Sequence, residues 1–333
     1  MVPTFKEVFY LSQELQLRYI KREDKKLSAA NTINRHLKEY KRYFEGTEFE
    51  SLPINKISVK DIKHHTLQTL ENFDLRRRAY NNFITLMRAA FVYALDEEII
   101  KENPMSVINF ANPRFINMLA EESDIYDRIY SDEELRKMLL YLRAKERRYP
   151  KRVSFMALEY QILMGERRGE VAPSKWSDIK EEDGIYYIEI RRELLDAANT
   201  VGNVIVEHTK TSKNRRVPIW YEVREFLDRL IVFHQHNNIN SEFLFPSKRS
   251  TTGCIDLKTP YRVFYEMCKD LGIKLDKSLP KGTHAYRRNF AKRIGDADLA
   301  SKLLGNDERV LRKNYYDGVD MRKALQVLSQ GHS

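Results

Sequence analysis

The stretch Gly165-Glu166-Arg167-Arg168-Gly169-Glu170 places two adjacent arginines in a glycine-flanked turn, directly after an apolar run. A glycine at the end of such a run marks the place where a buried element ends and the chain turns. A guanidinium group held there can bind two oxygens of a phosphate in planar, forked geometry. The segment therefore favours a specified, functional position for Arg167 over that of a solvated surface arginine.

Three later segments carry residues whose chemistry complements this arginine. They are Thr209-Lys210-Thr211, His284-Ala285-Tyr286-Arg287 and Tyr315. A second arginine can also bind phosphate, lysine and histidine can transfer protons, and a tyrosine oxygen can attack phosphorus. Together the segments contain the groups needed to cut DNA without a metal ion.

The order arginine, lysine, His-x-x-Arg and tyrosine resembles the tyrosine recombinases, also called phage-type integrases, over nearly the whole chain. Members of that family usually read Thr-Gly-x-Arg-x-Gly-Glu and then Trp-x-Asp, which residues 164–170 and 176–178 resemble. By this resemblance Arg167, and not Arg168, is the catalytic arginine. Residues 209–219 resemble the family's Thr-Lys-Thr hairpin, and this places Lys210 in the lysine role.

The third motif of the family, His-x-Leu-Arg-His-Thr-Phe, is similar to residues 284–290. His284 and Arg287 carry over by this resemblance, and Arg288 stands where a histidine is common. His284 would accept the tyrosine proton or bind the phosphate, and Arg167 and Arg287 would stabilise charge on the phosphate in the transition state. Glu170 would orient an arginine or histidine, or act as a carboxylate at a helix start.

The fourth motif departs most from the family, because the usual Leu-Leu-Gly-His is here Leu-Leu-Gly-Asn at residues 303–306. Asn306 carries no charge but can donate a hydrogen bond to a phosphate oxygen. The attacking tyrosine usually follows this position by nine residues, which is Tyr315, and Tyr316 is its nearest rival. The resemblance implies that no cofactor and no metal are needed. Lys213, Arg215 and Arg216 are expected to be phosphate contacts or solvated charges.

Composition is consistent with a nucleic-acid partner. The 333 residues include 58 Lys and Arg against 48 Asp and Glu, a net charge of +10 that fits a polyanion. No apolar run approaches membrane-spanning length, and two cysteines are too few for a disulfide framework. We therefore expect a cytoplasmic protein with no membrane contact. The histidines at 64–65 and at 234 and 236 are expected to be solvated helix positions.

Patterning predicts two domains and a mainly α fold with a small β-sheet, an α+β class. Residues 1–111 show helical spacing throughout and resemble the family's helical core-binding (SAM-like) domain; residues 112–130 are expected to be a linker, and 131–333 the catalytic domain. Helix starts are predicted at 28–33, at 58–61 and, through a capping box, at 131–134. Residues 185–190, 204–207 and 216–219 are predicted strands, the last two joined by a turn at 212–214.

The function implied by the resemblance is that of a site-specific DNA recombinase, an integrase that acts on double-stranded DNA through a 3′-phosphotyrosyl intermediate. The family acts as a tetramer on two DNA sites, in some members with accessory DNA-bending proteins. Residues 321–328 have helical apolar spacing and are expected to dock on a neighbouring subunit or on their own domain. The chain begins directly with helices, without the arm-binding domain of many integrases, so it is either a simple recombinase or a trimmed one.

Two alternatives stay open at this point. A type IB topoisomerase-like enzyme shares these catalytic residue types, although the helical N-terminal part resembles integrases more. A DNA-binding regulator that has lost catalysis would explain the departures at Asn306 and Arg288.

Overall fold

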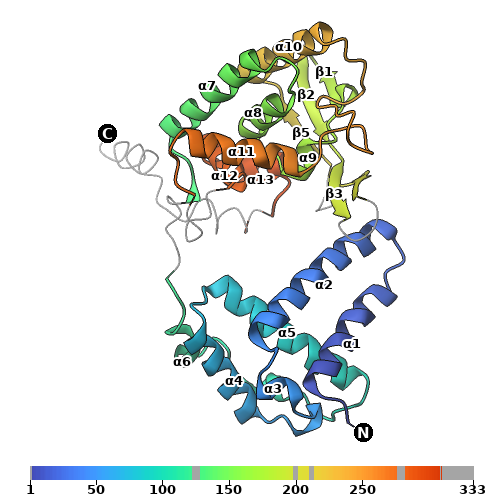
Figure 1. Cartoon of the computed structure of the whole chain (residues 1–333), viewed down its shortest axis with the longest axis vertical. Helices are drawn as coiled ribbons and strands as arrows, with labels where there is room; N and C mark the ends of the chain where they lie inside the picture. The colour runs from blue at the N-terminus through green and yellow to red at the C-terminus, as the bar shows by residue number, and fades with distance from the viewer. Residues whose placement is uncertain are drawn as a thin grey trace, which may run out of the picture. The chain divides into compact units, whose positions relative to one another are not determined.

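The computed structural model describes residues 2–121, 128–197, 202–209, 214–275, 282–307 and 309. The chain divides into two compact units, Met1–Glu122 and Ser123–Ser333. The described elements are mostly helices with small antiparallel sheets, so the predicted α+β class is confirmed (Figure 1). Within the described residues, none of the helices is both long enough and apolar enough to cross a lipid bilayer.

Helices make up all the regular elements described in the first unit. In chain order they are α1 (Phe5–Arg18), α2 (Glu23–Tyr43), α3 (Glu48–Ser51), η1 (Ile54–Lys56), α4 (Val59–Asn72), α5 (Arg77–Asp96), η2 (Pro104–Val107) and α6 (Pro113–Ile116). The helix α6 lies within the range expected for the linker, and Phe115 on it packs into the core of this unit. In the structure the first unit therefore extends into that range.

Local capping decides where several of these helices begin. Ser58 and Asp61 form the predicted cap of α4, with each side chain bonded to the backbone N–H of the other residue. The predicted start at 28–33 is wrong, because α2 already begins at Glu23. Within α2 the hydroxyl of Thr32 donates to the carbonyl of Ser28, so these polar residues are satisfied inside the helix and do not cap it.

The core of the first unit is built from aromatic rings. Phe44 packs against Phe5 and Tyr40, with ring centroids 5.2 and 5.3 Å apart. His65 was expected to be solvated, but it is buried and stacks on Phe49 at 4.5 Å. Burial lowers the pKa of His65 to about 4, so the ring is a neutral member of the aromatic core.

The second unit surrounds one buried helix. Its helices are α7 (Asp132–Arg148), α8 (Ser154–Met164), α9 (Arg168–Val171), η4 (Trp176–Asp178), α10 (Tyr221–His236), α11 (Lys258–Asp270), α12 (His284–Ile294) and α13 (Ala297–Leu304). Every residue of α8 is buried, and α7, α9, α10, α11 and α12 all contact it (Figure 1). The predicted capping box at the start of α7 is confirmed, with Ser131 and Glu134 as its partners.

Within the described residues of this unit, five strands form two antiparallel sheets. The first has the order β1 (Ile179–Glu182), β2 (Ile185–Ile190), β5 (Arg215–Pro218), and the second pairs β3 (Glu193–Ala197) with β4 (Gly202–Val206). The three predicted strands are present as β2, β4 and β5. Their expected pairing is wrong, because β4 pairs with β3 and β5 pairs with β2. A β4–β5 hairpin would have left the edges of β2 and β3 without partners.

The two sheets follow one another along a single bent ribbon. Ile190 is paired with Arg215 and Glu193 with Val206, so Arg191 and Arg192 lie between the two paired segments. Arg192 is buried at this break and donates through two nitrogens to Asp178, at 2.6 and 2.7 Å. The aspartate of the Trp-x-Asp motif therefore anchors the place where the ribbon changes sheets.

Candidate active site

The turn between α8 and α9 positions Arg167. Gly165 ends α8 with φ +62°, and a Cβ there would lie 2.6 Å from Cβ of Phe290, so only glycine fits. Arg167 is the N-cap residue of α9, and its backbone N–H donates to Oε2 of Glu170 at 2.9 Å. Arg167 is thus positioned by the fully buried helix α8, which is a rigid support.

Glu170 lies at the centre of a cluster of three arginines. Arg167 Nη1 donates to its Oε1 at 2.6 Å, and Arg215 donates to both carboxylate oxygens, at 3.0 and 2.5 Å. Nη1 of Arg287 lies 4.0 Å from Oε2. Burial alone would raise the pKa of Glu170, but the hydrogen bonds and charge of Arg215, with the charges of Arg167 and Arg287, lower it to about 2. We call these four residues the arginine cluster.

The C-terminal end of α13 contacts all three arginines through consecutive carbonyl oxygens. Those of Leu303, Leu304 and Gly305 accept hydrogen bonds from Arg215 Nε (2.9 Å), from Arg287 Nη2 and from Arg167 Nη2 (3.4 Å), respectively. The last carbonyls of a helix have no partner within it, and they carry partial negative charge. Here that unused hydrogen-bonding capacity orients the guanidinium groups.

Gly305 allows this arrangement. Its φ of +61° ends α13 in the left-handed region, and a Cβ would lie 3.1 Å from Arg215 Cδ. A side chain at this position would strain the backbone and crowd the arginine. The glycine of the fourth motif is therefore explained by the contact between α13 and the arginines.

Asn306 bridges Arg167 and Arg287. Its Oδ1 accepts hydrogen bonds from Nη2 of both residues, at 2.8 and 2.9 Å. The sequence predicted Asn306 as a donor to phosphate, and in the structure its oxygen is an acceptor between the two guanidinium groups. One oxygen therefore lies within hydrogen-bond distance of both guanidinium groups.

The helix α12 brings His284 and Arg287 to the same end of the unit. His284 is its first residue and is exposed, whereas Arg287, one turn later, is 1% exposed. The next two residues fix the helix to the segment before α7. Nη1 of Arg288 donates to the carbonyl of Arg128 at 2.9 Å. The side-chain amide of Asn289 accepts a hydrogen bond from the N–H of Tyr130 and donates one to its carbonyl. Arg288 therefore serves as an anchor for this segment.

Two predicted site residues, Lys210 and Tyr315, lie outside the described residues, as do Tyr316 and residues 321–328. The structure brings together Arg167, Glu170, Arg287 and Asn306. Arg215 is not a solvated charge, because its side chain is 4% exposed and is paired with Glu170, and its role as a phosphate contact stays a prediction. The alternation in β5, where Arg215 and Val217 are buried and Arg216 is exposed, is the pattern that could have revealed this.

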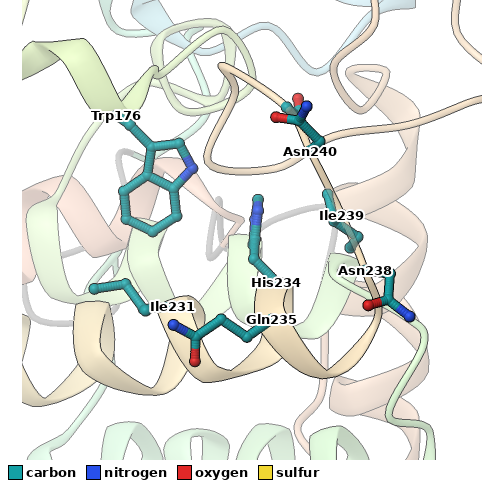
Figure 2. Close-up of a pocket in the computed structure, with 8 residues that line it drawn as sticks. Trp176, Ile231, His234, Gln235, Asn238, Ile239 and Asn240 are labelled. Atoms are coloured by element: carbon teal, nitrogen blue, oxygen red, sulfur yellow. The ribbon is translucent and has the colours of Figure 1, made fainter.

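A separate hollow of about 530 Å³ lies elsewhere in the second unit, between the end of α10 and the residues after it. Figure 2 shows the ring of Trp176 beside His234, with Ile231 and Asn240 on the rim. His234, expected to be solvated, is buried, and its Nε2 donates to the carbonyl of Leu244 at 3.0 Å. None of the arginine cluster lines this hollow, so it is distinct from the candidate active site.

Comparisons with known proteins identify relatives of this chain. The phage integrase family profile matches residues 129–307, which include every member of the arginine cluster. Tyrosine recombinase XerC of Leptospira interrogans is 29% identical over 320 residues, covering 95% of this chain and 91% of that protein.

Solved structures show the same fold. The Tn1549 transposon integrase in complex with circular intermediate DNA has a TM-score of 0.68 at 18% identity, covering 98% of this chain and 99% of that one. A lambda integrase tetramer bound to a Holliday junction has a TM-score of 0.60 at 18% identity, covering 91% of this chain and 77% of that one. The match to the family profile covers more than half of the chain and includes the residues of the arginine cluster. The chain therefore belongs to the phage integrase family of tyrosine recombinases.

Proposed function

We propose that this protein is a site-specific DNA recombinase in which Arg167 and Arg287 bind the phosphate to be cut and Tyr315 attacks it. The observation that carries the proposal is that Nη2 of both arginines donates to one oxygen, Oδ1 of Asn306, at 2.8 and 2.9 Å. A non-bridging phosphate oxygen is an acceptor of the same kind and adds negative charge, which strengthens the hydrogen bonds. The pair is thus already spaced to hold one phosphate.

The support around the arginines fits a role in the transition state. Glu170 and the carbonyls of α13 hold the guanidinium groups through hydrogen bonds within the protein. Donors that need no rearrangement stabilise developing charge more effectively than mobile ones. When a phosphate oxygen replaces the Asn306 oxygen, rotation of that amide would turn its Nδ2 donor toward the phosphate.

The reaction we propose has two balanced steps. The Tyr315 oxygen forms a bond to phosphorus while the bond to the 5′ oxygen breaks, His284 accepts the tyrosine proton, and Lys210 gives a proton to the leaving 5′ oxygen. In the second step the 5′ hydroxyl of a partner strand gives its proton to Lys210 and forms a bond to phosphorus, while the bond to the tyrosine oxygen breaks and Tyr315 takes its proton back from His284. One phosphodiester bond is exchanged for another, so no external energy source is required.

The proposed substrate is double-stranded DNA, and the proposed assembly is a homo-tetramer on two DNA sites. Support comes from the net charge of +10 and from fold relatives whose structures contain DNA or a tetramer on a Holliday junction. The helical first unit would act as the core-binding domain, and residues 321–328 would dock on a neighbouring subunit. Accessory DNA-bending proteins would assist assembly on the sites.

The deciding experiment traps covalent adducts on the DNA that flanks the protein's own gene. Nicked duplexes that span this DNA are incubated with the full chain, and adducts are separated on denaturing gels and mapped. Wild type should form a 3′ adduct, Tyr315→Phe should bind the same DNA without forming one, and Tyr316→Phe is the matched control that should remain active. The yield should persist in excess EDTA, because side chains supply the positive charge.

Each arm can contradict part of the proposal. Adducts formed by Tyr315→Phe but not by Tyr316→Phe would assign the attack to Tyr316. Inhibition by chelator that added metal reverses would refute the metal-independent mechanism. Relaxation of supercoiled plasmids without any strand exchange between two sites would favour the topoisomerase-like alternative.

A further inference from the structure

A buried carboxyl group directly precedes Arg167. Glu166 is 2% exposed, and the fully buried Tyr160 donates its hydroxyl to Oε1 at 3.0 Å. The backbone carbonyl of Glu166 accepts a hydrogen bond from Gln161 Nε2 at 3.2 Å. Both contacts come from α8, so the side chain and the backbone of Glu166 are held where α8 gives way to the arginine turn.

Titratable or charged groups face Glu166 from each neighbouring element. The helix α8 contributes Tyr160, α9 contributes the negative charge of Glu170, and β5 and α12 contribute the positive charges of Arg215 and Arg287. Arg215 directs its hydrogen bonds to Glu170 and to α13. Among the residues that the structure describes, none donates a hydrogen bond to Oε2 of Glu166.

An ionised carboxylate would be poorly stabilised at this place. Burial, and then the charge of Glu170, raise the pKa of Glu166 to about 8, against the opposing effects of Arg215, Tyr160 and Arg287. The pKa of Glu170 is lowered to about 2. The two carboxyl groups lie four residues apart, yet burial and the charge of Glu170 favour the neutral form of Glu166, whereas the arginines favour the ionised form of Glu170.

We propose that Glu166 holds a proton beside the arginine cluster and thereby sets how strongly the cluster binds a phosphate. With Glu166 neutral, the charges of Glu170 and the three arginines leave a net charge of two positive units, and ionisation of Glu166 reduces it to one. The attraction for an anion falls with that charge. The inference rests on the proposed function, because it takes Arg167 and Arg287 as phosphate ligands. Glu166 acts through them as a positioning residue.

Sulfate is a suitable probe, because it is a tetrahedral dianion throughout the range from pH 7 to pH 9. Its affinity for the full chain is measured by calorimetric titration at several pH values. For wild type the affinity should fall about fivefold or more across this range, the size expected for the loss of one nearby charge. Glu166→Gln should keep nearly constant affinity. Glu242→Gln makes the same chemical change at an exposed position paired with Lys175, and it should behave like wild type.

A direct measurement follows the Glu166 proton itself. In protein labelled with ¹³C at the glutamate carboxyl carbons, the signal missing from Glu166→Gln should change near pH 8. Tyr160→Phe should move this midpoint upward, because the tyrosine hydrogen bond favours the ionised form. This second variant tests the inference without removing the carboxyl group.

The possible results distinguish failure of the Glu166 inference from failure of the proposed recombinase function. A midpoint near the ordinary value of 4.5, or an equal fall of sulfate affinity in wild type and Glu166→Gln, would overturn the role of Glu166 and leave the recombinase proposal intact. Absence of sulfate binding to wild type at pH 7 would refute the phosphate site, and with it the inference.

Discussion

The two units of this protein bury different kinds of side chain. The first packs aromatic rings around Phe44, whereas the second buries ionisable side chains on α8 and around it: Glu159, Glu166, Glu170, Asp178, Arg192, Arg215 and Arg287. Aromatic packing stabilises a fold directly, but buried charges lose hydration and persist only with well-placed partners. The comparison indicates that the first core mainly supplies stability, whereas the second also holds charge in place for chemistry.

The largest effect should come from removing one arginine of the cluster. Arg287→Ala is expected to lower the rate of covalent adduct formation by about 10³-fold while changing DNA affinity little, because its contribution lies in the transition state. Arg293→Ala on the same helix removes an exposed arginine paired with Glu222 and should be nearly neutral. Adduct rate and DNA affinity are measured on the same duplex. Equal losses in both would show that Arg287 only anchors the phosphate.

A substitution in the aromatic core should affect stability and not the arginine cluster. Phe44→Ala is expected to cost about 3–5 kcal/mol of the free energy of unfolding, since the ring is fully buried. Tyr19→Ala, at a position 73% exposed, should change it by less than about 0.5 kcal/mol. Chemical denaturation gives both values. If Phe44→Ala also abolished sulfate binding under conditions where the protein is folded, the conclusion that the aromatic core does not affect the arginine cluster would be wrong.

Substitutions of Asn306 test whether the hydrogen bonds that join Arg167 and Arg287 in the second core contribute to the reaction. Asn306→Ala should lower adduct formation by about 10²-fold, because it removes the amide that both arginines share. Asn306→His keeps a hydrogen-bonding group and should retain activity. Adduct yields of these two variants and of wild type are compared on one duplex. An inactive wild type whose activity is restored by Asn306→His would instead support the regulator that has lost catalysis.

The smallest expected effect is a dependence of stability on pH. Because the pKa of Glu166 in the folded protein, about 8, is above its ordinary 4.5, wild type should lose stability relative to Glu166→Gln as pH rises between these values. The contribution of Glu170 to stability depends on pH in the opposite direction. It is present above about pH 4.5 and is lost as pH falls toward 2. The midpoint of thermal unfolding of Glu166→Gln should rise relative to that of wild type as pH increases from 5 to 8. A difference between the proteins that stays constant from pH 5 to pH 8 would contradict the raised pKa.

Local signals in the sequence predicted much of the architecture. The cap of α4 and the capping box of α7 were recognised because their partners are three residues apart, within reach of one helical turn. The glycine-flanked turn pointed to Arg167 for a similar reason, since the left-handed Gly165 is a local feature. By contrast, the start of α2 was misplaced, because Thr32 can satisfy its hydroxyl inside a helix as readily as it can cap one.

What the sequence by itself determined is the family, the α+β class and the residue types of the site, all of which depend on spacing along the chain. Only the tertiary structure decided that Arg215 shares Glu170 with Arg167, that α13 ends against three arginines and that Arg288 bonds Arg128. These contacts join residues far apart in the chain. A buried charge takes whichever partner the packing brings near, and the protonation of Glu166 and Glu170 follows from that environment.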